Sequence, residues 1–422
     1  MSSRFDVVVV GAGPAGASAA ITAARRGLRV AIIDKARFPR DKCCGDGLTA
    51  AALRRLESLG LSPDAVESWQ PASRAVVQAP GLRRLELPLS ADGLFAVSAQ
   101  RYHLDAALVD VARRAGVAIL EGHAVAGVKS SAGSVEVRSA SGMTLSADYV
   151  VAADGMWSAV RKLVSSDQPG YRGEWVAGRE YLSGTGPLAR DLWVFFEPDM
   201  LPGYAWSFPL ANGLVNVGYG VLRTSAGYAG GLRGQRVDWA SRPGIAEVLG
   251  PRAVTVGRWS SWPIPARLGH AELSALGGRV LFCGDAAGSC DPMTGEGIAQ
   301  ALDTGVLAAA CIATAGPSRP DKAAGSYKRT LRWGMQVDHG MSRLFSKVLA
   351  RPGGPAKSLS VISWSNWTRS NFARWMFEDY PRAVLATPHR WRPGMLAKPG
   401  AYRVTPDAHR TSPVGPRTTP DW

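Results

Sequence analysis

The N-terminal stretch FDVVVVGAGPAGASAAITAARRGLRVAIID places an alanine-rich segment between two short apolar runs. The run from Phe5 to Val10 is almost continuously β-branched, which is typical of a strand buried on both faces of a parallel sheet. The alanine-rich segment predicts a helix, and Arg29 to Ile33 predicts a second buried strand. This order of strand, turn, helix and strand predicts a Rossmann-like α/β domain.

Three later segments extend this domain. SAQRYHLDAALVDVARRAGV predicts an amphipathic helix near Arg101. ADYVVAADGMWSAVRKLV predicts a buried strand that runs into Asp154–Gly155, with Ser158 and Arg161 opening the next helix. GRVLFCGDAAGSCDPMTGEGIAQALDTGVLAA predicts a strand, then Gly284–Asp285, and then a long apolar helix. Taken alone, Arg161 fits a surface ion pair equally well.

The stretches 70–98 and 165–268 alternate apolar and polar residues and lack a long helical pattern. YAWSFP and LVNVGYG flank Ala211–Asn212–Gly213, which predicts a β-hairpin. We therefore expect an inserted antiparallel sheet. Its aromatic row of Tyr204, Trp206 and Phe208 is either a core stripe or the wall of a pocket.

These patterns predict a discontinuous α/β domain, an inserted sheet domain and a C-terminal helical region. The expected boundaries are 1–70, 99–164 and 270–320 for the first, 71–98 and 165–269 for the second, and 321–400 for the third. The Pro- and Thr-rich end, 401–422, predicts a disordered tail.

The net charge of +15 is concentrated near the C-terminus. Residues 341–422 carry 13 Lys and Arg against 4 Asp and Glu, a net charge of +9. Nucleic acid, anionic lipid and a diphosphate substrate are the partners that such a charge attracts. Nucleic acid is disfavoured because no nucleic-acid module is present, which leaves an anionic membrane surface or a solvated basic tail.

Cysteine usage and hydropathy indicate the compartment. Five cysteines and no secretory leader argue against a disulfide framework. No uninterrupted apolar run approaches the length needed to span a bilayer. We expect a cytoplasmic protein, either soluble or peripherally attached to a membrane.

Gly11, Gly13 and Gly16 form a G-x-G-x-x-G motif between the first strand and the helix. Such glycines permit a sharp turn and close approach of a pyrophosphate to the helix N-terminus. Asp34 ends the second strand, where it can accept hydrogen bonds from a ribose. This unit predicts FAD or NAD and does not decide between them.

The sequence resembles the flavoprotein hydroxylase superfamily in its motifs and in their order. These are the N-terminal glycine motif, the mid-chain Asp154–Gly155 and the late Gly284–Asp285. That resemblance implies FAD. Asp285 would hold the ribityl hydroxyls, and the amides of Gly297 and Ile298 would face the pyrimidine edge of the flavin. The cofactor-binding residues expected in this way are Gly11, Gly13, Ala15, Gly16, Asp34, Lys35, Cys44, Gly45, Arg101, Asp154, Gly155, Asp285, Gly295, Gly297 and Ile298.

CCGDGLT, which begins at Cys43, and PGYAWSFP together resemble the geranylgeranyl reductase family of flavoproteins. That family carries a cysteine–glycine pair beside the flavin and a P-x-Y-x-W-x-F-P signature in its substrate pocket. The signature falls here on Pro202, Tyr204, Trp206, Phe208 and Pro209. The resemblance covers residues 1 to about 320. It implies reduction of a geranylgeranyl group or the side chain of a menaquinone, with the sheet covering one face of the flavin.

Saturating an isolated alkene requires a hydride, a proton and a dry apolar slot. The flavin supplies the hydride. Cys44 is expected either to donate the proton or to shape the site against the flavin, and Asp46 is the fallback donor. Tyr204 and Trp206 would tolerate passing positive charge. Phe208 and Pro209 are expected to line the pocket. Cys43 fits either a functional thiol or a small buried residue.

Two further matters stay open in the sequence. The electron donor is either NAD(P)H or a reduced carrier protein. An FAD-dependent monooxygenase or halogenase acting on an aromatic substrate is the alternative activity, for which WSSWPIP at Trp259 to Pro265 is a loose match without an identifiable catalytic lysine. No metal site is predicted, because six scattered histidines offer no ligand spacing.

Overall fold

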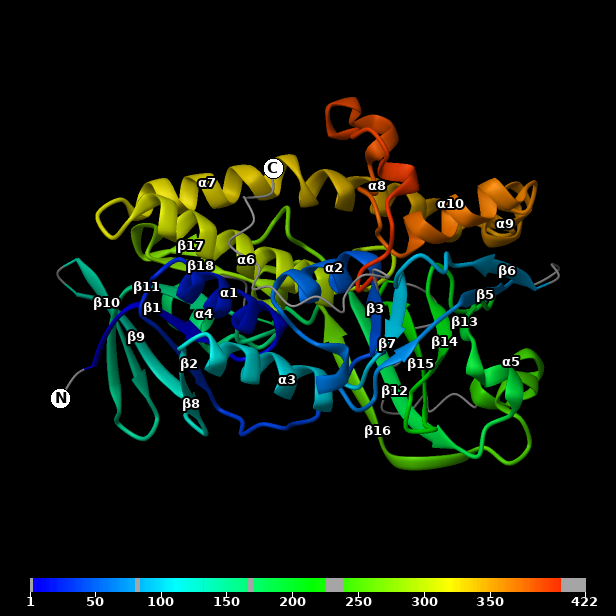
Figure 1. The fold of residues 1–422 in the computed structure, drawn as a ribbon, viewed down its shortest axis with the longest axis horizontal. Helices are drawn as coiled ribbons and strands as arrows, with labels where there is room; N and C mark the ends of the chain where they lie inside the picture. Colours follow the sequence, from blue (N-terminus) through cyan, green and yellow to red (C-terminus); the bar gives the residue numbers. More distant parts are fainter. Residues whose placement is uncertain (1–2, 80–83, 132, 166–169, 225–238, 404–422) are drawn as a thin grey trace, which may run out of the picture.

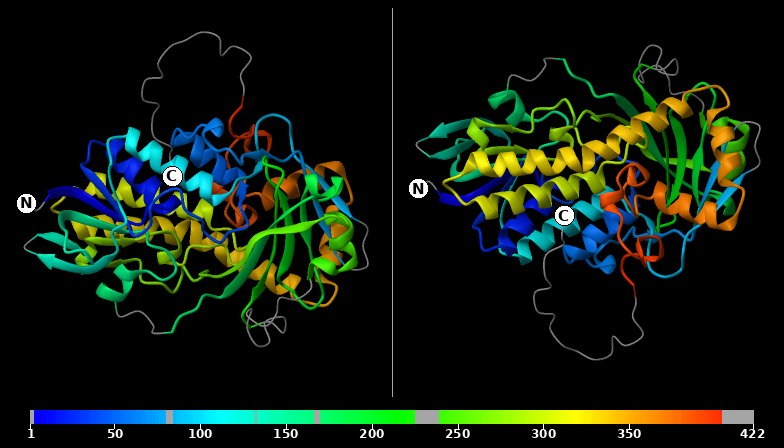
Figure 2. Two further views of the ribbon diagram at one scale, coloured as in Figure 1. Left: turned by 90° about the horizontal axis from the view of Figure 1, so that it is seen from below. Right: turned by 90° about the horizontal axis from the view of Figure 1, so that it is seen from above.

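The computed structural model describes residues 3–79, 84–131, 133–165, 170–224 and 239–403 (Figure 1). Two sheet-based halves lie side by side, and the C-terminal helices extend along the top of both in this view. The views in Figure 2 show the same helices forming one outer layer.

The first half is built on a largely parallel sheet with the strand order β17–β18–β11–β1–β2–β8. The apolar N-terminal run forms its centre, because β1 pairs with both β2 and β11 in parallel. The strands are β1 (Ser3–Val10), β2 (Val30–Asp34), β8 (Ala118–Glu121), β11 (Thr144–Ala152), β17 (Ser274–Ala275) and β18 (Val280–Phe282). An antiparallel extension, β9 (Val125–Ser131) and β10 (Ser134–Ser139), continues from β11.

The helices of this half are α1 (Pro14–Arg25), α2 (Ala50–Ser58), α3 (Arg101–Arg114), α4 (Ala159–Val164) and α6 (Ile298–Ala315). By length and composition, α6 could cross a membrane, since its 18 residues have a mean hydropathy of 1.5. This corrects the expectation that no run approaches that length. The helix is 72% buried inside the protein. Its apolar surface is therefore explained by packing, mainly against α1.

The second half is a sheet with the order β16–β12–β15–β14–β13–β5–β6. Neighbouring strands are antiparallel except β13 and β5, which come from separate insertions and pair in parallel. The predicted hairpin is present as β14 and β15. The strands are β5 (Arg74–Gln78), β6 (Leu85–Pro88), β12 (Trp175–Ser183), β13 (Leu192–Phe195), β14 (Tyr204–Pro209), β15 (Val215–Leu222) and β16 (Val254–Ile264), and α5 (Pro243–Leu249) packs beside them.

A small third sheet, with the order β3–β7–β4, lies between the halves. It consists of β3 (Gly47–Thr49), β4 (Gln70–Pro71) and β7 (Ala96–Ser98). The outer layer consists of α7 (Pro320–Trp333), α8 (Met335–Leu349), α9 (Gly354–Ile362) and α10 (Asn366–Met376).

The tail predicted to be disordered begins at 401, yet Ala401 is buried and forms a β-bridge with Leu94. Backbone pairing orders this first residue, which corrects the predicted boundary. The rest of the predicted tail, from 404 onward, lies outside the described residues.

Close packing of α1 on α6 gives a test of the core. A Cβ on Gly305 would overlap the Ala15 carbonyl oxygen and the Ser18 hydroxyl. We expect Gly305→Ala to lower the free energy of unfolding by about 1–3 kcal/mol, because the two helices would have to separate. Gly325→Ala, on the exposed side of α7 with open space around it, is the control. It should be neutral or stabilising by about 0.5–1 kcal/mol. Denaturant unfolding measures both, and equal effects would contradict this packing.

Candidate functional site

A cavity of about 760 Å³ lies where the two halves meet. Of the residues predicted as cofactor ligands, catalytic groups or pocket lining, all but Gly16, Pro202 and Pro209 line it. Those that line it are Gly11, Gly13, Ala15, Asp34, Lys35, Cys44, Gly45, Asp46, Arg101, Asp154, Gly155, Tyr204, Trp206, Phe208, Asp285, Gly295, Gly297 and Ile298. Gly16 lies behind the turn, where a Cβ would overlap the Gly11 carbonyl oxygen. Pro209 ends β14 beside Val215 and does not line the cavity.

The glycine turn is shaped for a close-fitting ligand. Gly11 has a φ of 100°, which L side chains rarely adopt, and a Cβ there would overlap the Ala153 carbonyl oxygen. Gly13 is the N-cap of α1, so the positive end of that helix opens onto the cavity. Asp34 accepts hydrogen bonds from the amides of Ala12 and Ala36, both at 2.7 Å. Its carboxylate has further lone pairs for a ribose.

Two guanidinium groups stand beside the turn. A Cβ on Gly13 would lie 3.7 Å from both Arg101 and Arg40. Arg101 donates to both oxygens of Asp105 at 2.7 Å, and Arg40 lies 3.0 Å from the same carboxylate. The pair is well placed for a pyrophosphate. Sequence analysis did not assign Arg40, although it belongs to the loop that carries the cysteines.

The two aspartate motifs are tied to one another. Asp154 accepts hydrogen bonds from the Ser158 hydroxyl at 2.6 Å and the Val160 amide at 3.0 Å, which caps α4. Arg161 on that helix donates from Nε to the Ala286 carbonyl at 3.0 Å. Arg161 therefore joins the Asp154–Gly155 turn to the loop of Asp285, which is a structural role that neither predicted alternative described.

The Asp285 carboxylate contacts two side chains, those of Cys290 and Lys42, that were not predicted as site residues. Cys290 Sγ donates to Asp285 Oδ1 at 3.4 Å, and Lys42 Nζ lies 3.7 Å from Oδ2. Lys42 also lies 4.7 Å from the ring centroid of Trp262, which belongs to WSSWPIP. A lysine is thus present in the cavity. Lys42 pairs with Asp285, the residue expected to hold the ribityl hydroxyls of the flavin. Lys42 therefore belongs to the part of the cavity expected to bind the cofactor.

The cysteine loop lies directly on the aromatic row. A Cβ on Gly45 would lie 3.4 Å from the Trp206 ring, and one on Gly47 would lie 3.1 Å from Phe208. Burial raises the pKa of the Cys44 thiol to about 11, so the thiol is neutral at pH 7. Arg101 lies close enough to stabilise a Cys44 thiolate. Cys43 also lines the cavity, and its Sγ donates to the Ser260 carbonyl at 3.4 Å.

Asp46 is fully buried and surrounded by donors. Its carboxylate accepts hydrogen bonds from Tyr181 Oη at 2.7 Å, Asn216 Nδ2 at 2.8 Å and the Arg101 amide at 3.3 Å. Burial raises its pKa to about 6, and these donors limit the rise. Because Asp46 accepts hydrogen bonds from three donors, it fixes the cysteine loop against the second sheet and the start of α3. Sequence analysis missed Tyr181 and Asn216, because only the folded sheet brings them to the loop.

The aromatic row forms one wall of the cavity. Ring centroids are 6.3 Å apart between Phe196 and Tyr204, 6.1 Å between Tyr204 and Trp206, and 6.3 Å between Trp206 and Phe208. Tyr204 Oη donates to the Thr294 carbonyl in the loop before α6. Phe196 and Phe208 also pack on the apolar cluster that includes Leu359 of α9 and Ala373 of α10. The row therefore serves both as pocket wall and as core.

The N-terminus of α6 carries a carboxylate that sequence analysis missed. Glu296 Oε1 accepts hydrogen bonds from the amides of Ile298 at 2.9 Å and Ala299 at 3.2 Å. The Ile298 amide, expected to face the flavin, is thus shared with Glu296. Glu296 also lines the cavity beside Cys44 and Tyr204.

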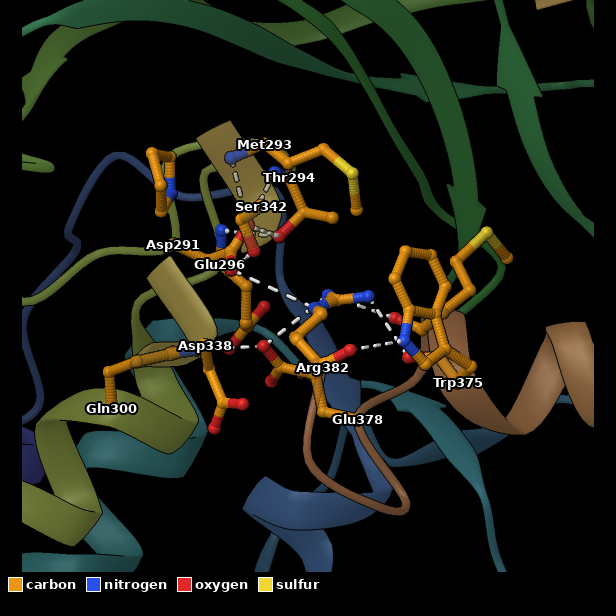
Figure 3. A network of polar contacts seen from close by, with 12 residues as sticks. Asp291, Met293, Thr294, Glu296, Gln300, Asp338, Ser342, Trp375, Glu378 and Arg382 are labelled. Carbon is orange, nitrogen blue, oxygen red and sulfur yellow. Dashed lines mark hydrogen bonds and ion pairs between the residues drawn. The ribbon is translucent and has the colours of Figure 1, made fainter. Parts of the chain in front are cut away.

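Figure 3 shows Arg382, which follows α10, with the carboxylates of Asp291, Glu296 and Glu378 around it. Arg382 lies 3.7 Å from Asp291 and 3.4 Å from Glu378. Glu378 also accepts a hydrogen bond from Gln300 on α6 at 2.8 Å. Burial raises the pKa values of Glu296 and Glu378, whereas Arg382 and hydrogen bonds hold that of Asp291 low. The C-terminal region thereby contacts the loop before α6 and the first turn of that helix, behind the residues that line the cavity.

Among the described residues, no group of three or more His, Cys, Asp and Glu is arranged to hold a metal ion. The donors present fit a dinucleotide instead: a glycine cradle, a helix N-terminus, two guanidiniums and a carboxylate for a ribose. Residues 4–178 match the FAD binding domain family.

The chain is 35% identical to the menaquinone reductase of Mycolicibacterium smegmatis, over 75% of this chain and 78% of that protein. The chain belongs to the geranylgeranyl reductase family of FAD-dependent oxidoreductases. The digeranylgeranylglycerophospholipid reductase of Methanothrix thermoacetophila is 29% identical over 81% of this chain and 85% of that protein.

Solved structures share the fold. A geranylgeranyl bacteriochlorophyll reductase-like protein from Thermoplasma acidophilum superposes with a TM-score of 0.74 at 20% identity, covering 93% of this chain and 100% of that one. The flavin-dependent halogenase CmlS superposes with a TM-score of 0.67 at 22% identity, over 93% of this chain and 74% of that one.

The buried carboxylates predict how stability depends on pH. Because the folded-state pKa values of Glu296 and Glu378 lie above the ordinary 4.5, the native state binds more protons than the unfolded state. The contribution of Glu296 and Glu378 to the free energy of unfolding is therefore lost as pH rises from about 5 to about 8. We expect Glu296→Gln/Glu378→Gln to flatten this decline in thermal stability. Glu136→Gln, at an exposed position of β10, is the control and should leave the pH dependence of thermal stability unchanged. A wild-type slope in the double variant would refute the assignment.

Proposed function

We propose that this chain is an FAD-dependent reductase that saturates carbon–carbon double bonds of an isoprenoid chain, with the side chain of a menaquinone as substrate. The observation that carries the proposal is the contact between the cysteine loop and the aromatic row, in the same cavity as the dinucleotide-binding residues. The mycobacterial menaquinone reductases, at 35% identity, favour a menaquinone tail over a geranylgeranyl group, whose archaeal reductases match at 28–32%.

The residues divide the work between cofactor and substrate. Gly11, Gly13, Arg40 and Arg101 would hold the pyrophosphate, and Asp34 a ribose. When bound and reduced, FAD supplies the hydride. The wall formed by Tyr204, Trp206 and Phe208 excludes water and presents aromatic faces to the positive charge that develops when the alkene is protonated.

The proton comes from the Cys44 thiol in this account. It leaves Sγ for the less substituted alkene carbon, the other carbon takes the hydride, and the thiolate remains beside Arg101. Asp46, the fallback donor, is better suited to hold the loop, because three donors point at its carboxylate. Cys43 donates away from the aromatic row to Ser260.

The anaerobically reduced protein, offered menaquinone and geranylgeranyl diphosphate separately, tests the proposal. Mass spectrometry should show a gain of two hydrogens per double bond in menaquinone, together with flavin reoxidation. An unchanged lipid, combined with oxygen-dependent addition to an aromatic compound, would establish a monooxygenase or halogenase instead. Repeating the reaction with NAD(P)H or a reduced carrier protein identifies the electron donor.

We further propose that the protein is cytoplasmic and meets its substrate at the inner face of a membrane. A menaquinone tail is soluble in lipid and not in water, and the basic C-terminal region fits an anionic surface better than nucleic acid.

Cys44→Ala should retain FAD and lose at least about 100-fold in turnover, which is the lower end of what removing a general acid costs. Cys311→Ala, a half-buried cysteine of α6 that does not line the cavity, is the matched control. Flavin absorbance reports cofactor content and steady-state kinetics report turnover. Full activity in Cys44→Ala would exclude the thiol as the proton donor.

A further inference from the structure

The outer helical layer leaves large apolar side chains exposed. Of the 14 large hydrophobic residues exposed in the described part of the chain, nine lie between 333 and 391. We call this set the C-terminal face: Trp333, Leu344, Phe345, Val348, Val361, Trp364, Trp367, Leu385 and Trp391. Three of its tryptophans are largely exposed to solvent, with exposed fractions of 78% for Trp364 and 67% for both Trp333 and Trp367. Clustering of this kind marks an interaction surface.

The residues of this set belong to one side of the molecule. They lie on or directly after α7, α8, α9 and α10, or in the segment that follows α10. Figure 1 shows these helices along the top, and the view from above in Figure 2 shows them nearest the viewer. Seven of the nine residues therefore come from one layer of helices, and Leu385 and Trp391 come from the segment that follows it.

Basic residues are interleaved with the apolar ones. On α8, Leu344 and Val348 are exposed four residues apart, next to Arg343 and Lys347, with Arg351 just beyond the helix. Residues three and four apart share a helix face. This face of α8 therefore presents adjacent apolar and cationic stripes.

Most exposed cations of this region lack an acidic partner, although Arg374 pairs with Asp379 just beyond it. Residues 322–377 contain ten Lys and Arg and one acid, Asp338. Asp338 is occupied by Arg390 at 2.7 Å. Within the described ranges, no ion pair involves the exposed cations Lys328, Arg329, Arg332, Arg343, Lys347, Arg351 and Lys357. Unpaired surface cations of this density attract an anionic partner.

We propose that the C-terminal face docks on an anionic lipid bilayer, with its tryptophans at the headgroup level and its Lys and Arg side chains on lipid phosphates. Tryptophan suits the boundary between headgroups and acyl chains because its ring is apolar and its N–H is polar. Amphipathic helices with basic polar faces bind in the same plane. A protein partner would be expected to use a more compact patch, whereas this face extends over four helices.

The docked orientation connects the bilayer to the cavity. The same helices α9 and α10 contact Phe196 and Phe208 on their inner side, and Phe208 lines the cavity. Apolar side chains on the inner surface of the docking layer therefore pack directly behind Phe208, which stands beside Trp206 in the cavity wall. This part of the inference rests on the proposed function, because it assumes a substrate with an isoprenoid tail.

Vesicle flotation of the full FAD-loaded protein tests the docking directly. Vesicles of phosphatidylcholine with phosphatidylglycerol should bind the protein, and pure phosphatidylcholine vesicles should bind it far more weakly. Lys347→Gln/Arg351→Gln should weaken anionic binding roughly 30-fold, since each cation contributes about fivefold. Trp364→Ser/Trp367→Ser should weaken binding to both kinds of vesicle.

Matched controls lie elsewhere on the surface. Val254→Ser/Val256→Ser removes two exposed apolar side chains from β16, and Lys129→Gln/Arg138→Gln removes two exposed cations from β9 and β10. Both controls should bind as the wild type does. Absent binding to anionic vesicles, or equal losses in face and control variants, would overturn the proposal.

Activity separates this proposal from the proposed function. With menaquinone in detergent, the face variants should turn over as the wild type does, whereas with menaquinone in anionic vesicles they should be slower. Vesicle binding by a protein that fails to reduce menaquinone in detergent would support docking and reject the activity. Equal loss of activity in detergent and in vesicles would reject docking as the role of these residues.

Discussion

The candidate site depends on one buried amide, Asn216, which joins the cysteine loop to the aromatic sheet. Its Nδ2 donates to the Cys44 carbonyl at 2.9 Å and to Asp46 at 2.8 Å, while its Oδ1 accepts from Trp206 Nε1 at 2.9 Å. Hydrogen bonds to a charged partner are worth about 1.5–3 kcal/mol, and a buried group left unpaired costs a comparable amount. Cys44 and Trp206 are therefore held in a fixed relation by a single side chain.

This constraint explains why the fold brings its parts together at one cavity. The parallel sheet supplies the glycine turn and the two aspartate turns, and the second sheet supplies the aromatic wall. The C-terminal region contacts the segment that leads into the cavity, because Arg382 lies beside Asp291 in the loop before α6 and Glu378 accepts a hydrogen bond from Gln300 on α6. The proposed proton donor, an apolar wall and a dinucleotide cradle therefore line one cavity.

Local patterns predicted the parallel half well. The strand at Phe5 to Val10, the turn at Gly11 and the helix start at Arg101 depend on neighbours in sequence, which periodicity and glycine spacing report directly. Most residues expected to bind cofactor line the cavity for the same reason. The parallel pair of β5 and β13 was not predicted, because it forms between two separate insertions.

The missed residues act across long separations in sequence. Asn216 donates a hydrogen bond to Cys44, which lies 172 residues away in the sequence. The hydrogen bonds from Tyr181 to Asp46 and from Gln300 to Glu378 span 135 and 78 residues. No local pattern distinguishes such an asparagine or glutamate from one on the surface. The exposed tryptophans and cations of the C-terminal face could not be predicted either, because composition located the charge but not which side chains are exposed.

A structure of the protein with FAD and a menaquinone bound would show whether Cys44 and the aromatic row form the substrate site. We expect the isoprenoid tail to lie against Tyr204, Trp206 and Phe208, with one of its double bonds within reach of Cys44 Sγ. A quinone ring in that position, or a tail bound away from the aromatic row, would contradict it.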